Sequence, residues 1–330
     1  MLKLVQIEES INKILAHSIV INKEKIPKGK ILHHEDIMLF KSIGIKKVYI
    51  FDQNKNYIDE NVASLKIAKY ISHKHIKINK PINGRADLFS TINGMLNYDK
   101  KKLINLNYLN DDLAVAMIKS EKIIKKNQLI GNVKILPYAI SKIKFDKILN
   151  NKSFFKILKI DKPITKIINL IITSNEENNK LNTKVINSIN DRLSKFNLKL
   201  KNTLYCKHST ESLIAFLKLR IIKNSDLILL YGSTSIVDKN DVLPRSLEKV
   251  NGKVISFGAP TDPGNLIMYG KLKNIKVIGV PGCAKSSLRN GFDLMLEKAC
   301  FDLKINKKII AEMSYGGLYK NFIKKNLNET

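Results

Sequence analysis

The sequence contains no tryptophan and only three cysteines, Cys206, Cys283 and Cys300. An odd number of widely separated cysteines argues against a disulfide framework and against a chelating cysteine pair. Proline and glycine are also scarce, at 8 and 15 of 330 residues, while 44% of the residues are hydrophobic. This composition is typical of a globular protein rather than a disordered one, and it fits a reducing cytoplasm.

Acidic residues are few, and so are arginines. The chain has 58 lysines and arginines against 29 acidic residues, which gives a formal charge of +29. The lysines are scattered along the chain, and isoleucine and asparagine are abundant, as in proteins of AT-rich genomes. Nucleic-acid binding would instead favour basic residues gathered on one element. We therefore expect no nucleic-acid partner, although a basic surface would speed encounters with a small anion.

Long hydrophobic runs are absent too. No stretch of about 18 uncharged apolar residues occurs, which is the length that a membrane-spanning helix needs. The first nine residues, Met1–Glu9, lack the pattern of a signal peptide. We expect a soluble, cytoplasmic protein with no membrane segment.

A chain of 330 residues has room for two domains. Residues 1–150 predict a small α/β unit followed by a β-rich part, with helical spacing at residues 8–15, 34–43 and 60–71. Strands and helices alternate regularly over residues 166–302, and residues 303–330 form a C-terminal extension. Such alternation predicts an α/β fold with an open, mainly parallel sheet that has helices on both faces.

Residues that could bind a metal ion or a phosphate follow one strand of this predicted sheet. Leu227–Tyr231 is an uninterrupted apolar run, typical of a strand buried on both sides. Asp238 and Asp241 come shortly after it and offer carboxylates of the kind that hold Mg²⁺. A short loop lies between the strand and these aspartates, and it consists of Gly232, Ser233, Thr234 and Ser235. Its backbone amides and hydroxyl groups can surround a phosphate.

The pattern recurs after a second strand, Lys276–Val280. The carboxyl ends of parallel strands meet at one edge of a sheet, where ligands of α/β proteins bind. Neither loop matches a P-loop or a dinucleotide fingerprint, so spacing alone predicts only a phosphorylated ligand. The second loop adds four candidate binding residues: Gly282, Cys283, Lys285 and Ser286.

Together these motifs resemble a known family. Residues 167–302 are similar to the molybdopterin-binding domain shared by the molybdopterin adenylyltransferase and the molybdopterin molybdenumtransferase of molybdenum-cofactor biosynthesis. Thr173–Glu176 stands where the family has Thr-Gly-Asp-Glu, and Gly279–Ala284 where it has Gly-Leu-Pro-Gly-Asn-Pro. Gly232–Ser235, with Asp241 and Pro244, matches the Gly-Gly loop followed by Asp and Thr-Pro.

The likeness is closest to a subgroup of molybdopterin-binding proteins from α-proteobacteria, often fused to a nucleotidyltransferase-like domain that this chain lacks. The chain departs from the family at Ser174 and Ser233, which replace glycines, and at Pro263–Leu266, which replaces Pro-Gly-Lys-Pro. The N-terminal Ser-Ala-Met-Asp-Gly signature of the molybdenumtransferase is also missing. The phrases shared with the subgroup are Gly84–Phe89, Asp262–Leu266, Pro281–Ser286, Asn290–Asp293 and Gly316–Leu318.

The resemblance implies a role for each candidate residue. Asp241 and Glu176 would be catalytic and, with Asp238, would bind Mg²⁺, while the two loops would hold the phosphate. Several of these residues have alternative interpretations: Glu176 as an exposed loop residue, Lys285 as a solvated lysine, and Gly232–Ser235 as a tight turn that needs small residues. Asp241 would otherwise cap the helix that begins near Pro244, and Cys283 would otherwise only pack.

The implied function is Mg²⁺-dependent insertion of molybdenum, supplied as molybdate, into molybdopterin or its adenylated form. One alternative is a non-catalytic carrier of molybdopterin that serves a nucleotidyltransferase or an apo-molybdoenzyme. The other is a hydrolase of pyridine nucleotides built on the same fold. Relatives with this fold form dimers or trimers, so a homo-oligomer is among the expectations.

Overall fold

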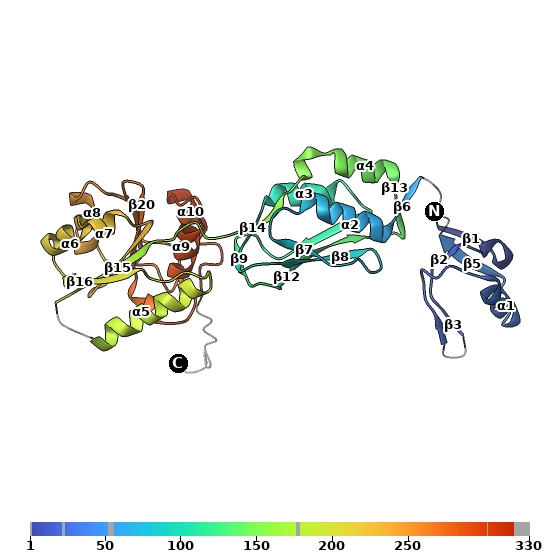
Figure 1. Cartoon of the computed structure of the whole chain (residues 1–330), viewed down its shortest axis with the longest axis horizontal. Helices are drawn as coiled ribbons and strands as arrows, with labels where there is room; N and C mark the ends of the chain where they lie inside the picture. The colour runs from blue at the N-terminus through green and yellow to red at the C-terminus, as the bar shows by residue number, and fades with distance from the viewer. Residues whose placement is uncertain (1, 22–23, 52–55, 176–178, 302, 320–330) are drawn as a thin grey trace, which may run out of the picture. The chain divides into compact units, whose positions relative to one another are not determined.

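The computed structural model describes residues 2–21, 24–51, 56–175, 179–301 and 303–319. The chain divides into two compact units, Met1–Asp161 and Lys162–Thr330 (Figure 1). Each unit has its own sheets and its own hydrophobic core. No helix within the described ranges is long and apolar enough to cross a membrane.

The first unit begins with a small antiparallel sheet in the order β1-β5-β2, together with a helix and a hairpin. Its core contains Leu15, Leu32, Phe40 and Ile50, all almost completely buried. The elements are β1 (Leu2–Gln6), η1 (Ile7–Ser10), β2 (Ile14–Leu15), β3 (Ile19–Ile21), β4 (Glu24–Ile26), α1 (His34–Ser42) and β5 (Lys47–Phe51).

The helix expected over residues 8–15 is not formed, whereas those expected near 34–43 and 60–71 are present. Asn12 has a φ of +59°, which interrupts any helix there. The amides of Asn12 and Leu15 donate instead to the carbonyls of Leu32 and Lys30, both at 2.8 Å. An isolated helix of this length is marginal, so pairing with a distant segment prevails.

The remainder of the first unit packs helices against β-sheets. The strand orders are β10-β12-β8-β7, β11-β9-β14 and β13-β6. Helix α2 buries Ala63, Ile67 and Ile71, which recur every four residues on one face. The elements are β6 (Tyr57–Asp59), α2 (Glu60–Ile71), β7 (Ile76–Ile78), β8 (Arg85–Ser90), β9 (Gly94–Tyr98), α3 (Lys100–Tyr108), β10 (Leu113–Met117), β11 (Lys122–Ile124), β12 (Leu129–Ile135), β13 (Ala139–Ser141), α4 (Lys142–Asn150), η2 (Lys152–Phe154) and β14 (Leu158–Asp161).

The second unit contains a six-stranded sheet in the order β16-β15-β17-β20-β19-β18. The first four strands in this order run parallel, and the last two pair antiparallel with their neighbours. The α/β expectation therefore holds, but the sheet is mixed rather than simply parallel. The strands are β15 (Ile168–Ser174), β16 (Asn202–Lys207), β17 (Leu227–Gly232), β18 (Lys253–Phe257), β19 (Met268–Leu272) and β20 (Ile275–Val280).

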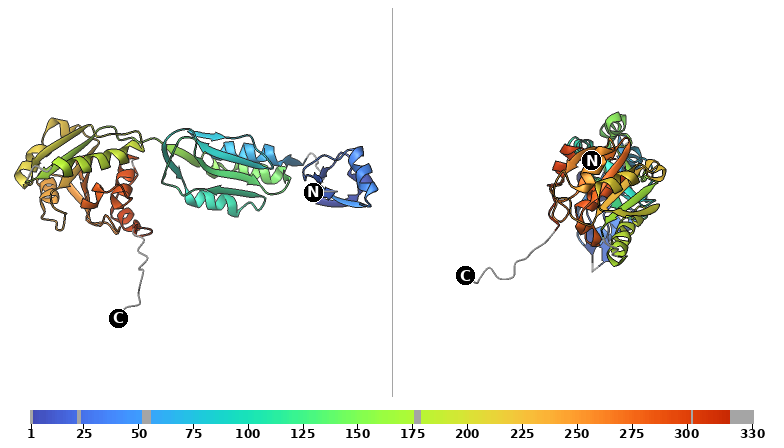
Figure 2. Two further views of the ribbon diagram at one scale, coloured as in Figure 1. Left: turned by 90° about the horizontal axis from the view of Figure 1, so that it is seen from below. Right: turned by 90° about the vertical axis from the view of Figure 1, so that its left-hand side faces the viewer.

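Helices cover both faces of this sheet (Figure 1, Figure 2). Leu213 of α6 and Leu247 of α8 share a core with Ile171, Ile228 and Leu230. Because strand side chains alternate between faces, the intervening strand residues point toward α5 and α9 on the other side. The helices are α5 (Asn179–Ser194), α6 (Thr210–Leu217), α7 (Arg220–Lys223), α8 (Val242–Lys249), η3 (Gly282–Lys285), α9 (Gly291–Cys300) and α10 (Lys307–Glu312).

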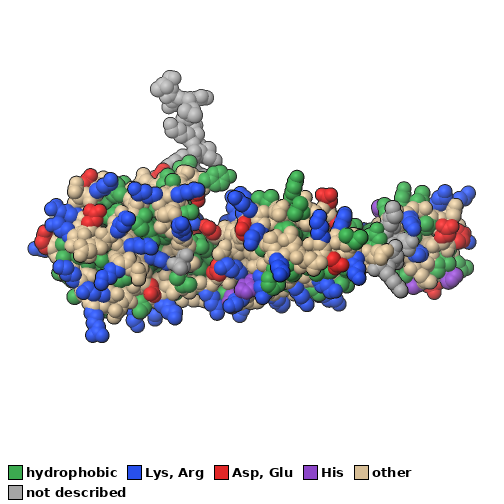
Figure 3. All heavy atoms as spheres, turned by 90° about the horizontal axis from the view of Figure 1, so that it is seen from above, with side chains coloured by type: hydrophobic (Ala, Val, Ile, Leu, Met, Phe, Trp, Pro, Cys, Tyr) green, Lys and Arg blue, Asp and Glu red, His purple; other side chains and the backbone are tan. Residues whose placement is uncertain are grey.

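Basic side chains are spread over the face drawn in Figure 3 rather than gathered on one element. On the face drawn in Figure 3, lysine and arginine side chains are interspersed with acidic and apolar ones in each unit. This distribution agrees with the interpretation of the charge as a property of composition.

Candidate functional site

The three loops singled out in the sequence follow neighbouring parallel strands. Thr173 of β15 is in register with Gly232 of β17, and Tyr231 of β17 with Val280 of β20. Their carboxyl ends therefore lie at one edge of the sheet. The loops after β17 and β20 also approach each other, since a Cβ on Gly282 would lie 3.8 Å from the Ser235 hydroxyl.

A cavity of about 430 Å³ opens between these two loops and a third segment. Ser235 contributes from the loop after β17, and Gly282, Cys283 and Lys285 contribute from the loop after β20. Residues 262–266 form the other wall. The structure thus brings four of the predicted binding residues together around one volume.

A smaller hollow of about 230 Å³ lies beside the ends of β15 and β17. Thr173, Ser174 and Ser233 line it. Ser233 and Thr234 are exposed, whereas Gly232 is buried in a tight turn. A Cβ on Gly232 would lie 3.0 Å from the Thr234 carbonyl, so a larger residue would require the turn to shift by a few tenths of an ångström.

Asp241 closes the loop before α8 instead of capping that helix. It occupies the N-cap position but makes no side-chain bond to the helix amides. Its Oδ2 atom accepts from the amides of Val237 and Asp238, at 2.6 and 2.9 Å. Asp238 accepts from the Asn240 amide at 2.7 Å. Both carboxylates therefore shape this loop, and the capping alternative for Asp241 does not apply.

The described residues contain no protein-only metal site. No three His, Cys, Asp or Glu side chains gather anywhere in these ranges. Glu176, the third predicted metal ligand, lies outside the described residues. Mg²⁺ is usually bound by one or two carboxylates, with waters and substrate phosphates completing its shell. The Asp241 carboxylate would suit an ion of this kind, held jointly with a phosphorylated ligand.

His208 belongs to this edge, although the sequence analysis did not identify it. It follows β16, its Nδ1 atom lies 2.6 Å from Thr173 Oγ1, and its Nε2 atom lies 3.2 Å from Thr234 Oγ1. Burial lowers the pKa of this imidazole, and the nearby Asp241 carboxylate opposes that shift. A single histidine after a strand gives no signal in sequence, because its partners are distant along the chain.

We expect His208 to make the fold sensitive to acid. Its pKa is lowered in the folded state, so the unfolded chain binds the proton more readily. The contribution of the neutral ring is complete above the unfolded pKa of about 6.5 and is lost as the pH falls below it. His208→Asn should cost about 1 kcal/mol at pH 7.5, through weakened hydrogen bonds.

Urea unfolding of both proteins at pH 7.5 and 5.5 measures this effect. The difference in unfolding free energy between wild type and variant should shrink at the lower pH. The other histidines are common to both proteins and cancel in this difference. An equal difference at the two pH values would show that His208 does not carry the acid sensitivity.

Arg192 of α5 supports the loop after β20, and its side chain is only 3% exposed. Its guanidinium donates to the carbonyls of Ala284, Ser286 and Leu288 at 2.8–3.1 Å. It also forms an ion pair with Asp293 of α9 at 3.1 Å. These bonds fix the backbone that carries Gly282, Cys283 and Lys285, so Arg192 is a positioning residue for the cavity.

The predicted binding residues Cys283 and Ser286 differ in their surroundings. Cys283 is partly buried and lines the cavity, so contact with a ligand remains open to it alongside packing. The Ser286 hydroxyl accepts from the Leu288 amide at 3.2 Å, and Ser286 is not among the residues that line the cavity. The Ser286 hydroxyl therefore stabilises the loop and does not contact the cavity.

Three glycine-containing sequence segments that the chain shares with the subgroup contact one another next to the cavity. The Gly291 amide donates to the Pro263 carbonyl, and the Asp262 amide to the Gly317 carbonyl, both at 2.9 Å. A Cβ on Gly291 would lie 2.0 Å from Thr261 Oγ1, so glycine is required for this approach. Residues 262–266 are therefore braced by α9 and by the segment near residue 317.

Comparison with known proteins adds two findings. Residues 4–52 match the model of a domain of unknown function, DUF8806. A crystal structure of the molybdopterin biosynthesis MoeA protein from Pyrococcus horikosii is similar with a TM-score of 0.31 and 13% identity, over 92% of this chain and 76% of that one. No curated protein matches the sequence.

Proposed function

We propose that the carboxyl edge of the second unit binds molybdopterin or its adenylated form, and that it supports Mg²⁺-dependent insertion of molybdenum from molybdate. One observation carries the proposal. The loops that resemble the family's motifs, distant in sequence, lie at one edge and line a common cavity through Ser235, Gly282, Cys283 and Lys285. Small residues there let backbone amides approach a ligand closely.

Different residues at this edge would bind the phosphate and the Mg²⁺ ion. Lys285 is exposed at the cavity and offers a cation to a phosphate, and the exposed hydroxyls of Ser233, Thr234 and Ser235 offer donors. Asp241 keeps the loop after β17 in shape through Oδ2, and its carboxylate would be a protein ligand to Mg²⁺. When bound, the ion would supply positive charge to offset the charge that develops as AMP leaves.

The proposal is tested by replacing Asp241 with asparagine. An amide oxygen still accepts from Val237 and Asp238, so the loop keeps its shape while the charge is lost. We expect AMP release from adenylated molybdopterin, with Mg²⁺ and molybdate added, to fall about 100-fold or more. Molybdopterin affinity should change only a few-fold, because the cavity itself is intact.

Asp226→Asn provides the matched control, since one Asp226 oxygen likewise accepts from two backbone amides, those of Lys166 and Ile167 at 2.7 and 2.9 Å, just before β17 begins. A similar loss in both variants would assign the effect to a general loss of stability rather than to the Asp241 charge. Unchanged AMP release in Asp241→Asn would contradict the proposed role. Binding without release by the wild-type protein would favour the carrier alternative, and absence of binding would exclude both.

A further inference from the structure

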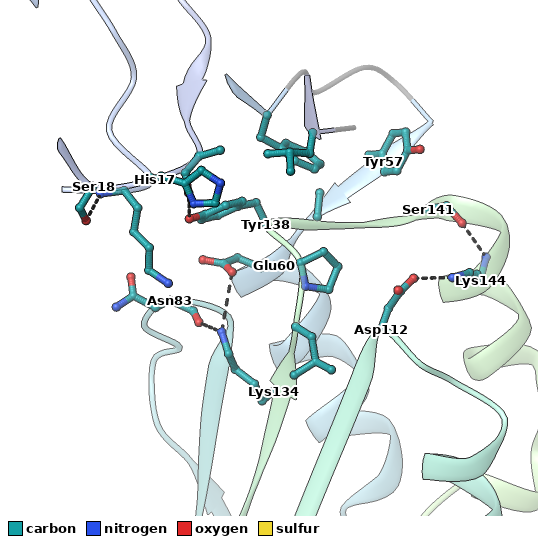
Figure 4. Close-up of a pocket in the computed structure, with 18 residues that line it drawn as sticks. His17, Ser18, Tyr57, Glu60, Asn83, Asp112, Lys134, Tyr138, Ser141 and Lys144 are labelled. Atoms are coloured by element: carbon teal, nitrogen blue, oxygen red, sulfur yellow. Dashed lines mark hydrogen bonds and ion pairs between the residues drawn. The ribbon is translucent and has the colours of Figure 1, made fainter. Parts of the chain in front are cut away.

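The first unit contains a cavity of about 770 Å³ that the proposed function does not use (Figure 4). It lies where helix α2 begins and where the chain leaves β12, and its lining includes Glu60, Lys134 and Tyr138. Its volume falls within the range of about 300–1,000 Å³ that is usual for small-molecule sites.

Glu60 is a largely buried acid that lines this cavity. Its side chain is 13% exposed, and its ion pair with Lys134 spans 3.9 Å, too far for a hydrogen bond. No hydrogen bond to its carboxyl oxygens is recorded among the residues that the structure describes. Buried carboxyl groups normally have close donors. The Glu60 oxygens are therefore available to donors from a ligand.

The neighbouring turn is built to admit this carboxyl group. Gly84 has a φ of +74°, and a Cβ there would lie 2.8 Å from Glu60 Oε2. The Gly84 amide donates to Asn61 Oδ1 at 2.9 Å, which fixes the turn against α2. Burial raises the pKa of Glu60, as expected for an acid removed from water, while Lys134 and Lys28 act in the opposite direction.

Two lysines give this end of the cavity an excess of positive charge. Lys134 donates to the Asn83 carbonyl and retains further N–H donors, and Lys28 lies 5.8 Å from the centre of the Tyr138 ring. The opposite end is neutral, because Lys144 is paired with Asp112 at 2.7 Å. Figure 4 shows Asn83 and Lys134 on one side of Glu60, and Asp112 with Lys144 on the other.

Aromatic rings form part of the remaining wall. Phe51 lies 6.1 Å from Tyr57 and 6.0 Å from Tyr138, measured between ring centroids. The Tyr138 hydroxyl donates to the Ala16 carbonyl, which holds its ring in place. Aromatic side chains of this kind present faces on which a planar ring can stack.

We propose that this cavity binds a planar 2-amino-oxo heterocycle that carries an anionic group. Two adjacent N–H donors of the ring would meet the Glu60 carboxylate, and the anionic group would meet Lys28 and Lys134. A carboxylate accepts two parallel N–H bonds in this way from any fork of donors. Guanine nucleotides and pterins share this donor edge. The site belongs to the first unit and does not depend on the function proposed for the second.

The test is calorimetric titration of the full chain with guanosine 5′-monophosphate, adenosine 5′-monophosphate and pterin-6-carboxylate. We expect Glu60→Gln to weaken binding of the first or third compound at least tenfold, because an amide has one acceptor oxygen and its NH2 group would face the second N–H donor of the ring. The adenine nucleotide lacks the paired donors and should bind at least tenfold more weakly than its guanine counterpart. Lys134→Met, an independent variant, should also weaken binding of the anionic ligands.

Glu35→Gln serves as the matched control, because Glu35 is exposed on α1 in the same unit. This control should bind like the wild-type protein. Preference for the guanine nucleotide or for the pterin acid identifies the source of the ligand. The proposal is overturned if neither compound binds, if Glu60→Gln binds as tightly, or if the two nucleotides bind equally.

Discussion

Replacing Arg192 with alanine should destabilise the protein by about 3–5 kcal/mol, the usual cost of removing one partner from a buried ion pair. Arg192 and Asp293 are 3% and 5% exposed, so the variant would leave Asp293 charged, buried and without its cation. The carbonyls of Ala284, Ser286 and Leu288 would each lose one donor as well and would keep only their bonds from the Ser188 hydroxyl or the Asn290 side chain. We therefore also expect weaker ligand binding at the cavity after β20.

Urea unfolding measures this effect, with Arg85→Ala as the matched control. Arg85 and Asp87 also form an arginine–aspartate pair, at 2.7 Å, but they are 49% and 32% exposed. Exposed pairs contribute about 0–1 kcal/mol, so the control should be nearly neutral. A loss below about 1 kcal/mol in Arg192→Ala would contradict the assignment of Arg192 as the support of the loop.

The cause of the loss can be separated with a second pair of variants. Arg192→Met retains much of the side-chain volume, and adding Asp293→Asn removes the charge left behind. The double variant should be more stable than the sum of the two single changes predicts. Strict additivity would show that the loss comes from the carbonyl contacts rather than from the uncompensated charge of Asp293.

Replacing Gly264 with alanine should cost about 3 kcal/mol or more, since backbone strain and overlap with fixed atoms act together. Gly264 has a φ of +114°, and a Cβ there would lie 2.6 Å from the Gly291 amide nitrogen. That nitrogen is held in its turn by the Pro263 carbonyl, at 2.9 Å. Neither segment can move without separating the cavity wall from the start of α9.

Gly316→Ala controls for strain alone. Gly316 has a φ of +77°, and a Cβ there would meet no atom within 4 Å. We expect this control to cost about 1 kcal/mol. The difference between the two variants in thermal or urea unfolding then reports the steric overlap at Gly264. Similar losses in both would mean that residues 262–266 relax away from α9, and the bracing described above would be wrong.

Much of the second unit could be predicted from its sequence because its strands are buried on both sides. All six residues of β17 are buried, so the strand appears as an uninterrupted apolar run. The small and polar loop residues after β17 and β20 could also be recognised in the sequence. In the structure one cavity is lined by Ser235, Gly282, Cys283 and Lys285. The antiparallel direction of β19 and β18 was not anticipated, because strand direction leaves little trace in residue pattern.

The supporting residues could not be found in this way. Arg192 and Asp293 are 101 positions apart in the chain, and His208 lies 35 positions from Thr173. Only folding brings such pairs together. Similarly, Glu60 looks like an ordinary acid in the first turn of a helix, and its burial depends on the turn at Gly84.

The sequence by itself determined the class of the second unit and the composition of its edge loops, because local apolar runs and small polar residues act over a few positions. The tertiary structure alone decided which loops share a cavity and which carboxylates shape a loop. It also decided which charges are buried. Burial, and therefore the strength of a charge or the need for a hydrogen-bond partner, is set by contacts between distant segments.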